Sequence, residues 1–290
     1  MSVKPTKPVK QEIETTGHVW DGIEELNTPM PRWWLWTFVG TIIWGLGYSV
    51  AYPAWPLIHG ATPGLLGAST RADVAADIQR FEAANSEISA RLASADLAAI
   101  ATTPELQAYA TSAGAAIFRT NCSQCHGSGA AGVQASGYPN LLDDDWLWGG
   151  DIVMIHTTIT HGVRNDTDPD TRFSQMPAFG EILERAQIDQ VVQHVLAISG
   201  QDHDASLAGL GAVVFAENCV ACHGEAGIGN RELGAPNLTD AIWLYGNSTE
   251  KLLQTVTYAR NGVMPNWNNK LSETQIRAVA AYVHQLGGGE

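Results

Sequence analysis

The pattern of apolar and polar residues changes sharply near the start of the chain. An uncharged apolar run extends from Trp33 to Trp55, and a helix of that length, rising about 1.5 Å per residue, crosses a hydrocarbon core of about 30 Å. Aromatic residues gather at both ends of the run, as at two membrane interfaces: Trp33, Trp34, Trp36, Tyr48, Tyr52 and Trp55. The run starts too late and is too long for a cleaved signal peptide. It therefore predicts one transmembrane helix.

The rest of the chain is patterned for helices. Apolar residues recur at helical spacing, and the pattern shows no strand-like alternation. It predicts helices over residues 113–120, 152–160, 188–198, 210–218, 249–258 and 275–286, with a linker helix or two within 71–100. Ser272 is the expected N-cap of the last helix, with Gln275 as its capping-box partner. The predicted fold class is mainly α.

The segment after the apolar run contains an internal duplication. Asn-Cys-Ser-Gln-Cys-His-Gly begins at Asn121, and Asn-Cys-Val-Ala-Cys-His-Gly begins 97 residues later, at Asn218. Matching residues continue downstream until Met176 meets Met264 at an offset of 88, so the first copy carries about nine extra residues, most simply within 165–174. A repeat this consistent predicts two tandem domains of one fold.

These patterns divide the chain into five segments. They are an N-terminal segment over 1–32, the transmembrane helix over 33–55, a helical linker over 56–104, and two all-α domains over 105–200 and 201–290. A domain of about 90 residues has a small core, so each copy is expected to need something besides its own side chains to fill it.

Charge sets the orientation of the predicted helix and excludes one class of partner. Four cations precede the apolar run, and no Lys or Arg follows it until Arg71: the four are Lys4, Lys7, Lys10 and Arg32. The positive-inside rule therefore puts the N-terminus in the cytoplasm and both repeats on the outer side. The formal net charge of the whole chain is −14, and a chain so poor in cations is not expected to bind nucleic acid.

Each repeat carries a Cys-x-x-Cys-His motif, formed by Cys122, Cys125 and His126 and by Cys219, Cys222 and His223. Two thiols at this spacing can add to the two vinyl groups of one haem, and the following His is then held beneath the iron. The alternatives are a redox dithiol or a shared zinc site. A redox dithiol is expected between a strand and a helix, a context that these motifs lack. Neither a redox dithiol nor a zinc site accounts for the Met-Pro pair that recurs downstream of each motif. The motifs predict two covalently attached haem c groups.

The sixth ligand of each iron is expected to be a repeated soft or imidazole donor. Met176 and Met264 are the repeat-matched candidates, each followed by Pro, whereas Met154 has no counterpart. His161 aligns with Tyr258 and is therefore not a repeated ligand. Ligation within each repeat is the simplest arrangement, because a loop and a helix separate each motif from its own Met. Exchange of the two methionines between the repeats is the alternative.

Other residues give no sign of a reaction centre. The chain has no cluster of copper ligands and no clear general acid–base pair, so no catalytic residue of its own is expected. Arg164 and Arg260 lie near the expected haem edge. Each either forms an ion pair with a haem propionate or remains exposed to solvent.

Taken together, these features resemble a known family. Asp21–Asn27, followed by Pro29, Pro31 and Arg32, looks like the N-terminal signature of the dihaem subunit (FixP/CcoP type) of cbb3-type cytochrome c oxidases. The two Cys-x-x-Cys-His motifs, Thr160–Arg164, Met176–Phe179 and Met264-Pro265 match its haem domains, so the resemblance covers nearly the whole chain. It implies covalent haem attachment at Cys122, Cys125, Cys219 and Cys222, with His126, Met176, His223 and Met264 as axial iron ligands.

The resemblance also implies a function and a location. The subunit would accept electrons from cytochrome c or the bc1 complex and pass them, through the monohaem cytochrome c subunit, to the haem–copper subunit that reduces oxygen. It would be a single-pass protein of the bacterial inner membrane with periplasmic haem domains. Two alternatives stay open: an anchored dihaem cytochrome c that serves a different periplasmic redox enzyme, and a dihaem peroxidase. A peroxidase needs a five-coordinate iron, against which the matched methionines argue.

Overall fold

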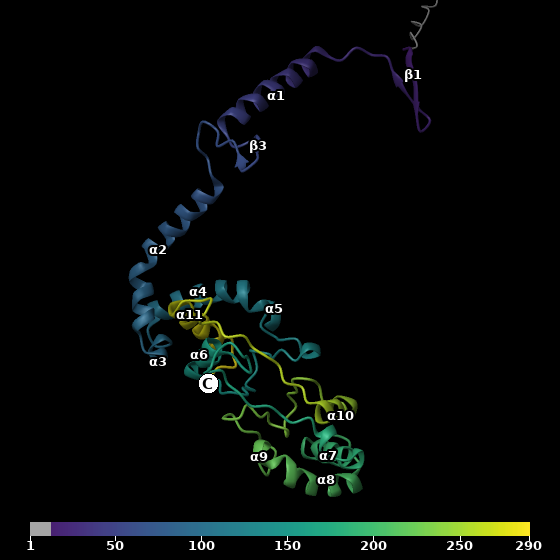
Figure 1. Ribbon diagram of the computed structural model, residues 1–290, viewed down its shortest axis with the longest axis vertical. Helices are drawn as coiled ribbons and strands as arrows, with labels where there is room; N and C mark the ends of the chain where they lie inside the picture. Colours follow the sequence, from purple (N-terminus) through teal and green to yellow (C-terminus); the bar gives the residue numbers. More distant parts are fainter. Residues whose placement is uncertain (1–12) are drawn as a thin grey trace, which may run out of the picture. The chain divides into compact units, whose positions relative to one another are not determined.

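The computed structural model describes residues 13–290 (Figure 1). Lys4, Lys7 and Lys10, which carry most of the charge asymmetry in the sequence, lie outside the described residues. The chain divides into two compact units, Met1–Glu82 and Ala83–Glu290. The apolar helix belongs to the first unit, and both Cys-x-x-Cys-His motifs belong to the second.

The first unit contains two short hairpins. β1 (Thr15–Trp20) pairs antiparallel with β2 (Ile23–Leu26), and Asp21 and Gly22 between them both have positive φ, 48° and 85°. β3 (Pro56–Leu57) pairs with β4 (Gly60–Ala61). The sequence predicted neither hairpin, although the fold is mainly α as expected. The strands are too short for alternation to stand out, and the readable signal was the Asp-Gly pair of a tight hairpin turn.

α1 (Arg32–Ala51) is the apolar helix that the sequence predicts. Its 20 residues are long and apolar enough to cross a membrane, and none of them is buried. The helix ends where Tyr52 takes up an extended backbone before Pro53, because a residue that precedes proline is disfavoured in the α conformation. Within residues 13–290, no other helix meets the same criteria of length and hydropathy.

The second unit is built from helices. α2 (Thr70–Ser94) spans the division between the units, and the remaining helices are α3 (Leu97–Ile100), α4 (Pro104–Asn121), α5 (Ser123–His126), α6 (Ile152–His161), α7 (Arg185–Ile198), α8 (Ala205–Asn218), α9 (Val220–His223), α10 (Thr249–Tyr258) and α11 (Glu273–His284), with 3-10 turns η1 (Gln134–Ser136) and η2 (Phe179–Glu181). All six helices predicted in the repeats are confirmed. α4 and α8 begin earlier than predicted, because Pro104 starts the former and the Asp204 side chain caps the latter. Ser272 and Gln275 form the expected capping box of α11.

The closing helix of each repeat packs in the other repeat. α11, from the second repeat, packs against α4 and α6 of the first, while α7, from the first repeat, packs against α8 and α10 of the second. We call α4, α5, α6 and α11 the first lobe, and α7, α8, α9 and α10 the second lobe. The repeats predicted over 105–200 and 201–290 are therefore not the units that pack, since each lobe takes its last helix from the other repeat.

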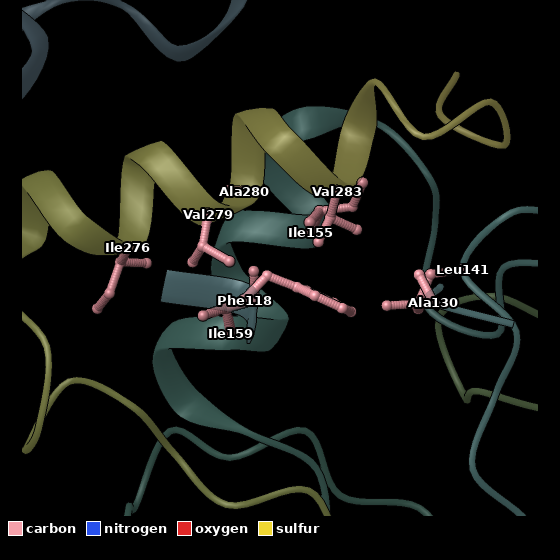
Figure 2. Close-up of a cluster of buried hydrophobic side chains, with 9 residues drawn as sticks. All are labelled: Phe118, Ala130, Leu141, Ile155, Ile159, Ile276, Val279, Ala280 and Val283. Atoms are coloured by element: carbon pink, nitrogen blue, oxygen red, sulfur yellow. The ribbon is translucent and has the colours of Figure 1, made fainter. Parts of the chain in front are cut away.

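Figure 2 shows the core of the first lobe, where three helices meet. Phe118 comes from α4, Ile155 and Ile159 from α6, and Val279 and Val283 from α11, and all five are buried. Burying one such side chain fully contributes about 1.5–3 kcal/mol. The first lobe consequently depends on apolar surface that the second repeat supplies.

The second lobe repeats this construction with the roles of the two repeats reversed. Val191, Val192 and Val195 of α7 pack with Phe215 of α8 and Leu252 of α10. In each lobe an aromatic residue of the opening helix meets a ring of the exchanged helix. The ring centroids of Phe118 and Tyr282 lie 5.5 Å apart, and those of Phe215 and His194 lie 5.1 Å apart.

Equivalent glycines let the exchanged helices approach closely. Gly114 of α4 and Gly211 of α8 occupy matching positions, 97 residues apart. A Cβ on Gly114 would overlap the Ala278 carbonyl oxygen of α11, and one on Gly211 would overlap the Gln190 carbonyl oxygen of α7. Only glycine allows the backbones to come this near. The two glycines therefore specify a close crossing of α4 with α11 and of α8 with α7.

The end of the predicted linker belongs to the first lobe. Leu92 of α2 and Ile100 of α3 are both 0% exposed and lie in one cluster with Leu106 of α4. The Arg277 guanidinium of α11 donates to the Ala95 carbonyl oxygen at 2.6 Å. The segment from 83 to 104 thus adds a layer of packing to the first lobe.

Candidate functional site

Both Cys-x-x-Cys-His motifs form one helical turn directly after a long helix. In the first motif, the Cys125 and His126 N–H groups donate to the Cys122 carbonyl oxygen at 3.1 and 3.0 Å. In the second motif, the Cys219 carbonyl oxygen accepts the corresponding bonds at 3.2 and 2.9 Å. Residues three apart on a helix share a face, so the two thiols of each motif lie on one side. All four cysteines are free of disulfides.

The ring of each motif histidine is held in one orientation. Nδ1 of His126 lies 3.2 Å from the Pro139 carbonyl oxygen, and Nδ1 of His223 lies 3.1 Å from that of Pro236. A carbonyl oxygen can only accept, so Nδ1 carries the proton and Nε2 is left bare. Burial lowers the pKa of both imidazoles, against the opposing effect of these hydrogen bonds. A neutral imidazole with a bare Nε2 is the form that binds a metal.

The environment of the thiols does not suit a redox dithiol. Burial, to which the neighbouring thiol adds, raises the pKa of Cys122 and of Cys219 to about 11. A reactive dithiol needs a lowered pKa, since the thiolate is its nucleophile. Each motif also follows a helix, whereas a redox dithiol is expected to follow a strand.

Each motif lines a cavity to which the other repeat contributes the methionine. Met264 lines the cavity of the first motif (the first cavity), and Met176 lines that of the second motif (the second cavity). The expectation that each methionine lies with the motif of its own repeat is therefore wrong. The physical reason is the exchange of closing helices, because each methionine segment directly precedes α7 or α11 and is carried with that helix into the other lobe.

Hydrogen bonds across the repeats hold the backbone of both methionine segments. The Met264 N–H donates to the Val163 carbonyl oxygen at 3.0 Å, and the Val163 N–H donates back at 2.9 Å. The Asn165 amide donates to the Met264 carbonyl oxygen at 3.4 Å. Asn261, from the matching Arg-Asn pair of the second repeat, bonds the Met176 backbone at 3.3 and 3.4 Å. Equivalent asparagines thus each hold the methionine of the other repeat.

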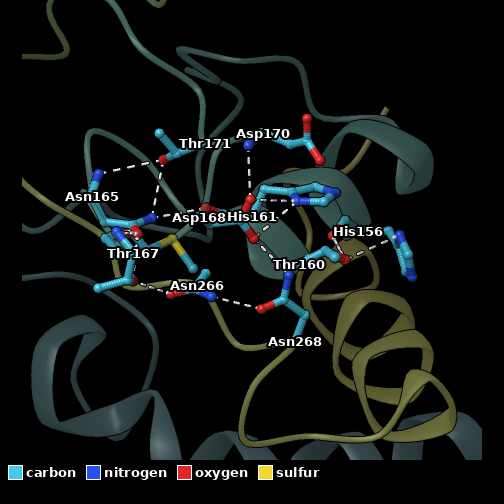
Figure 3. A network of polar contacts seen from close by, with 11 residues as sticks. His156, Thr160, His161, Asn165, Thr167, Asp168, Asp170, Thr171, Asn266 and Asn268 are labelled. Carbon is cyan, nitrogen blue, oxygen red and sulfur yellow. Dashed lines mark hydrogen bonds and ion pairs between the residues drawn. The ribbon is translucent and has the colours of Figure 1, made fainter.

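The extra residues of the first repeat brace the Met264 segment (Figure 3). The Thr167 hydroxyl donates to the Asn266 side-chain oxygen at 2.7 Å, and the Asn268 amide donates to the Asp168 carboxylate at 2.6 Å. His161 does not line either cavity, and its Nδ1 lies 3.1 Å from that carboxylate. The buried polar residues among residues 13–290 all belong to this network: Asn165, Asp168 and Asn266. Buried polar groups are tolerated when they are hydrogen-bonded, so the network orders the segment that carries Met264.

The two cavities share a wall. The residues that line both are Tyr138, Pro139, Asn140, Asp145, Leu147, Arg164 and Leu244. Pro139 is also the residue whose carbonyl oxygen orients His126. Burial, reinforced by Asp240 and Asp143, raises the pKa of Asp145 to about 6. Groups bound in the two cavities are therefore neighbours.

Sequence reasoning missed the residues that connect the repeats. The matched Arg-Asn pairs at 164–165 and 260–261 were a readable signal for the two asparagines that hold the methionines. The insertion at 165–174 was located from the repeat, but its role in bracing Met264 was not predicted. The exchange of α7 and α11 cannot be recognised from the repeated sequence. The apolar faces of these two helices are the same whether each helix packs in its own repeat or in the other one.

Comparison with known proteins adds the identity of the family. The family described as the N-terminal domain of cytochrome oxidase-cbb3, FixP, matches residues 12–59, and that described as cytochrome C oxidase, cbb3-type, subunit III, matches residues 110–195 and 207–283. The cbb3-type cytochrome c oxidase subunit CcoP of Cereibacter sphaeroides is 66% identical over 292 residues, which cover 100% of both chains. The chain belongs to the CcoP/FixP family of cbb3-type cytochrome c oxidase subunits.

Two further relatives agree with this placement. The CcoP subunit of Rhodobacter capsulatus is 58% identical over 301 residues, covering 100% of both chains, and the FixP subunit of Sinorhizobium medicae is 49% identical over 278 residues, covering 96% of each. The two matched segments of the subunit III family coincide with the two repeats. Domains of cytochrome c type imply haem c. The donor set of each cavity, two thiols, a neutral imidazole and a thioether, fits that cofactor.

Proposed function

We propose that this chain is the electron-relay subunit of its oxidase and carries two covalently attached haem c groups. Cys122 and Cys125 hold one haem through thioether bonds, and Cys219 and Cys222 hold the other. The observation that carries the proposal is the wall shared by two cavities, each with the donor set of a haem c site. An electron that enters one cavity has the other as its immediate neighbour, and two adjacent sites of this kind are what a relay requires.

The axial ligands are proposed to pair across the repeats. His126 and Met264 ligate the iron of the first cavity, and His223 and Met176 ligate that of the second. The support is the common lining of each cavity, together with the hydrogen bonds that hold each methionine segment to the other repeat. These bonds come from Val163 and Asn165 for Met264, and from Asn261 for Met176. A thioether ligand raises the reduction potential of a haem, as suits a step close to the terminal oxidant.

The haem groups supply the one-electron chemistry, and the residues of this chain control their surroundings. Pro139 and Pro236 keep each imidazole in the tautomer that leaves Nε2 bare. The buried side chains of both lobes keep water from the iron sites, and the asparagine contacts hold each thioether segment in place. A histidine and a methionine on each iron would leave no open position for oxygen, so we assign oxygen reduction to the haem–copper subunit of the complex.

The path of electrons through the complex follows from this assignment. Cytochrome c or the bc1 complex is the proposed donor, and the monohaem cytochrome c subunit carries the electrons onward to the haem–copper subunit. The part of the chain after residue 55 has 12 Lys and Arg and 25 Asp and Glu. Such an acidic surface favours a basic donor, because complementary charge speeds diffusional encounter.

The chain is proposed to be anchored by α1 in the bacterial inner membrane, with its N-terminus cytoplasmic and its haem domains periplasmic. The cations before the helix and their absence between Arg32 and Arg71 support this orientation. Alkaline phosphatase, which is active only outside the cytoplasm, is expected to be active when fused after Ala68 and inactive when fused after Lys10. The opposite pattern of activity would overturn both the orientation and periplasmic haem attachment.

The relay function is tested on the detergent-purified complex. The chain is expected to copurify with a haem–copper subunit and a monohaem cytochrome c. The pyridine haemochrome spectrum of the complex is expected to give three haem c groups, two of them on this chain. Stopped-flow mixing with a reduced cytochrome c should reduce these haems before oxygen is consumed. Copurification with a periplasmic dehydrogenase alone would favour the anchored cytochrome of another enzyme. A high-spin haem that turns over peroxide would favour the peroxidase.

A further inference from the structure

Arg164 occupies an unusual position between the two methionine segments. It follows α6 by three residues and has φ = +52°, in the left-handed region that residues other than glycine seldom adopt. Its N–H donates to the Arg172 carbonyl oxygen at 2.8 Å, which holds the backbone in this conformation. Strain of this kind persists only where the surrounding structure enforces it, and it is concentrated at functional sites.

The guanidinium of Arg164 binds both methionine segments at once. Nε donates to the Gly262 carbonyl oxygen at 2.7 Å, and Nη1 donates to the Ser174 carbonyl oxygen at 3.1 Å. Gly262 precedes Met264 by two residues, and Ser174 precedes Met176 by two residues. The planar fork of one arginine therefore sets the spacing of two loops that belong to different repeats.

The charge of Arg164 has no protein counter-charge. No carboxylate among residues 13–290 lies within salt-bridge distance of it, and burial lowers its pKa. The second amino group, Nη2, makes no hydrogen bond within this part of the chain. Arg164 is partly buried, and a guanidinium that lacks a carboxylate partner favours a carboxylate or another anion placed beside it. Because Arg164 lines both cavities, that anion can come from either.

The equivalent arginine of the second repeat is arranged differently. Arg260 lines only the second cavity and lies over the Tyr245 ring, 4.3 Å from its centroid. Its guanidinium binds the Thr255 hydroxyl and the Lys251 carbonyl oxygen, both within the second lobe. Arg164 alone of the pair connects the two cavities, and the repeat therefore offers a matched control.

We propose that Arg164 is a positioning residue shared by both haem sites, which ties the two methionine segments together and supplies one positive charge to the carboxylates of the groups bound in both cavities. The inference rests on the proposed function, because it assumes a haem, with its two carboxylate side chains, in each cavity. A positive charge beside an iron favours the reduced state. Removing it is expected to lower both reduction potentials together and to weaken both methionine–iron bonds.

The test compares variants of the whole detergent-purified complex in potentiometric titrations, with no donor or oxygen present. Arg164→Gln is expected to lower the reduction equilibrium constant of both haems of this chain about tenfold, a shift of about 59 mV for one electron. Arg164→Lys keeps the charge and is expected to restore most of that shift in both haems. Arg260→Gln is expected to leave the haem of the first motif unchanged.

Several results would overturn the inference. Arg164→Gln shifting one haem only, or neither, would mean that the charge is not shared, and Arg164→Lys shifting both as far as Arg164→Gln would mean that charge is not the cause. If the Gln variant fails to retain haem, the Lys variant decides alone. Lysine cannot bind the Gly262 and Ser174 carbonyl oxygens with one planar group, so Arg164→Lys should weaken the methionine–iron absorption band of both haems. An unchanged band would refute the proposal that Arg164 ties the two methionine segments together. A wild-type complex without that band would instead refute the proposed ligands.

Discussion

Met264→Ala is expected to open the sixth coordination position of the haem at Cys122 and Cys125, and to leave the haem at Cys219 and Cys222 six-coordinate. The structure places Met264 in the cavity of the first motif and pairs its backbone with Val163. Alanine has no donor atom, so the first iron should become high-spin and bind carbon monoxide. The weak methionine-to-iron absorption band should be lost from that site alone.

Chains that carry a single haem separate the two possible pairings. With Cys219→Ala and Cys222→Ala, only the first motif holds haem. Its band should then disappear with Met264→Ala and survive Met176→Ala. With Cys122→Ala and Cys125→Ala in place of these changes, the dependence should reverse.

Met154→Ala is the control for these experiments, because Met154 lines neither cavity and its sulfur accepts from Arg172. It should leave both haems six-coordinate. If the single-haem chains instead lose their band with the methionine of the same repeat, exchange of ligands between the repeats is refuted.

Gly211→Ala is expected to destabilise the second lobe, whereas Gly209→Ala on the same helix is expected to stabilise it slightly. A Cβ on Gly211 would overlap the Gln190 carbonyl oxygen of α7, while a Cβ on Gly209 would meet nothing within 4 Å. Overpacking of this kind costs about 1–3 kcal/mol. Replacing an exposed helical glycine with alanine gains up to about 1 kcal/mol.

The opposite signs make the comparison informative. Thermal unfolding followed in the Soret band and by circular dichroism should show a lower midpoint for Gly211→Ala and an equal or higher one for Gly209→Ala. Gly114→Ala, at the matching position of α4, should behave like Gly211→Ala, because its Cβ would overlap the Ala278 carbonyl oxygen of α11. A Gly211→Ala protein as stable as Gly209→Ala would mean that α7 and α8 do not cross as closely as described.

Most of the secondary structure could be predicted from local patterns in the chain. The helices around both motifs, the apolar helix α1 and the capping box of Ser272 were predicted because each depends on residues that are close in sequence. The hairpin of β1 and β2 was missed, since its strands are too short for alternation to stand out and only the Asp21-Gly22 turn marked it. The early start of α4 was missed, although Leu106 and Ala110 continue its buried face back towards Pro104.

The sequence by itself determined the chemistry of this protein: the four thiols, the two histidines and the two methionines, together with the duplication that relates them. These residues could be recognised because the spacing of residues within each motif and between the two repeats is visible in the sequence. Only the tertiary structure decided which methionine lies with which motif, and which residues connect the two cavities. The two repeats carry equivalent apolar faces and equivalent glycines, so either closing helix fits either lobe by pattern alone. Contacts between residues far apart in sequence, such as those of Arg164 with Gly262 and of Asn268 with Asp168, join the two repeats in this exchanged arrangement.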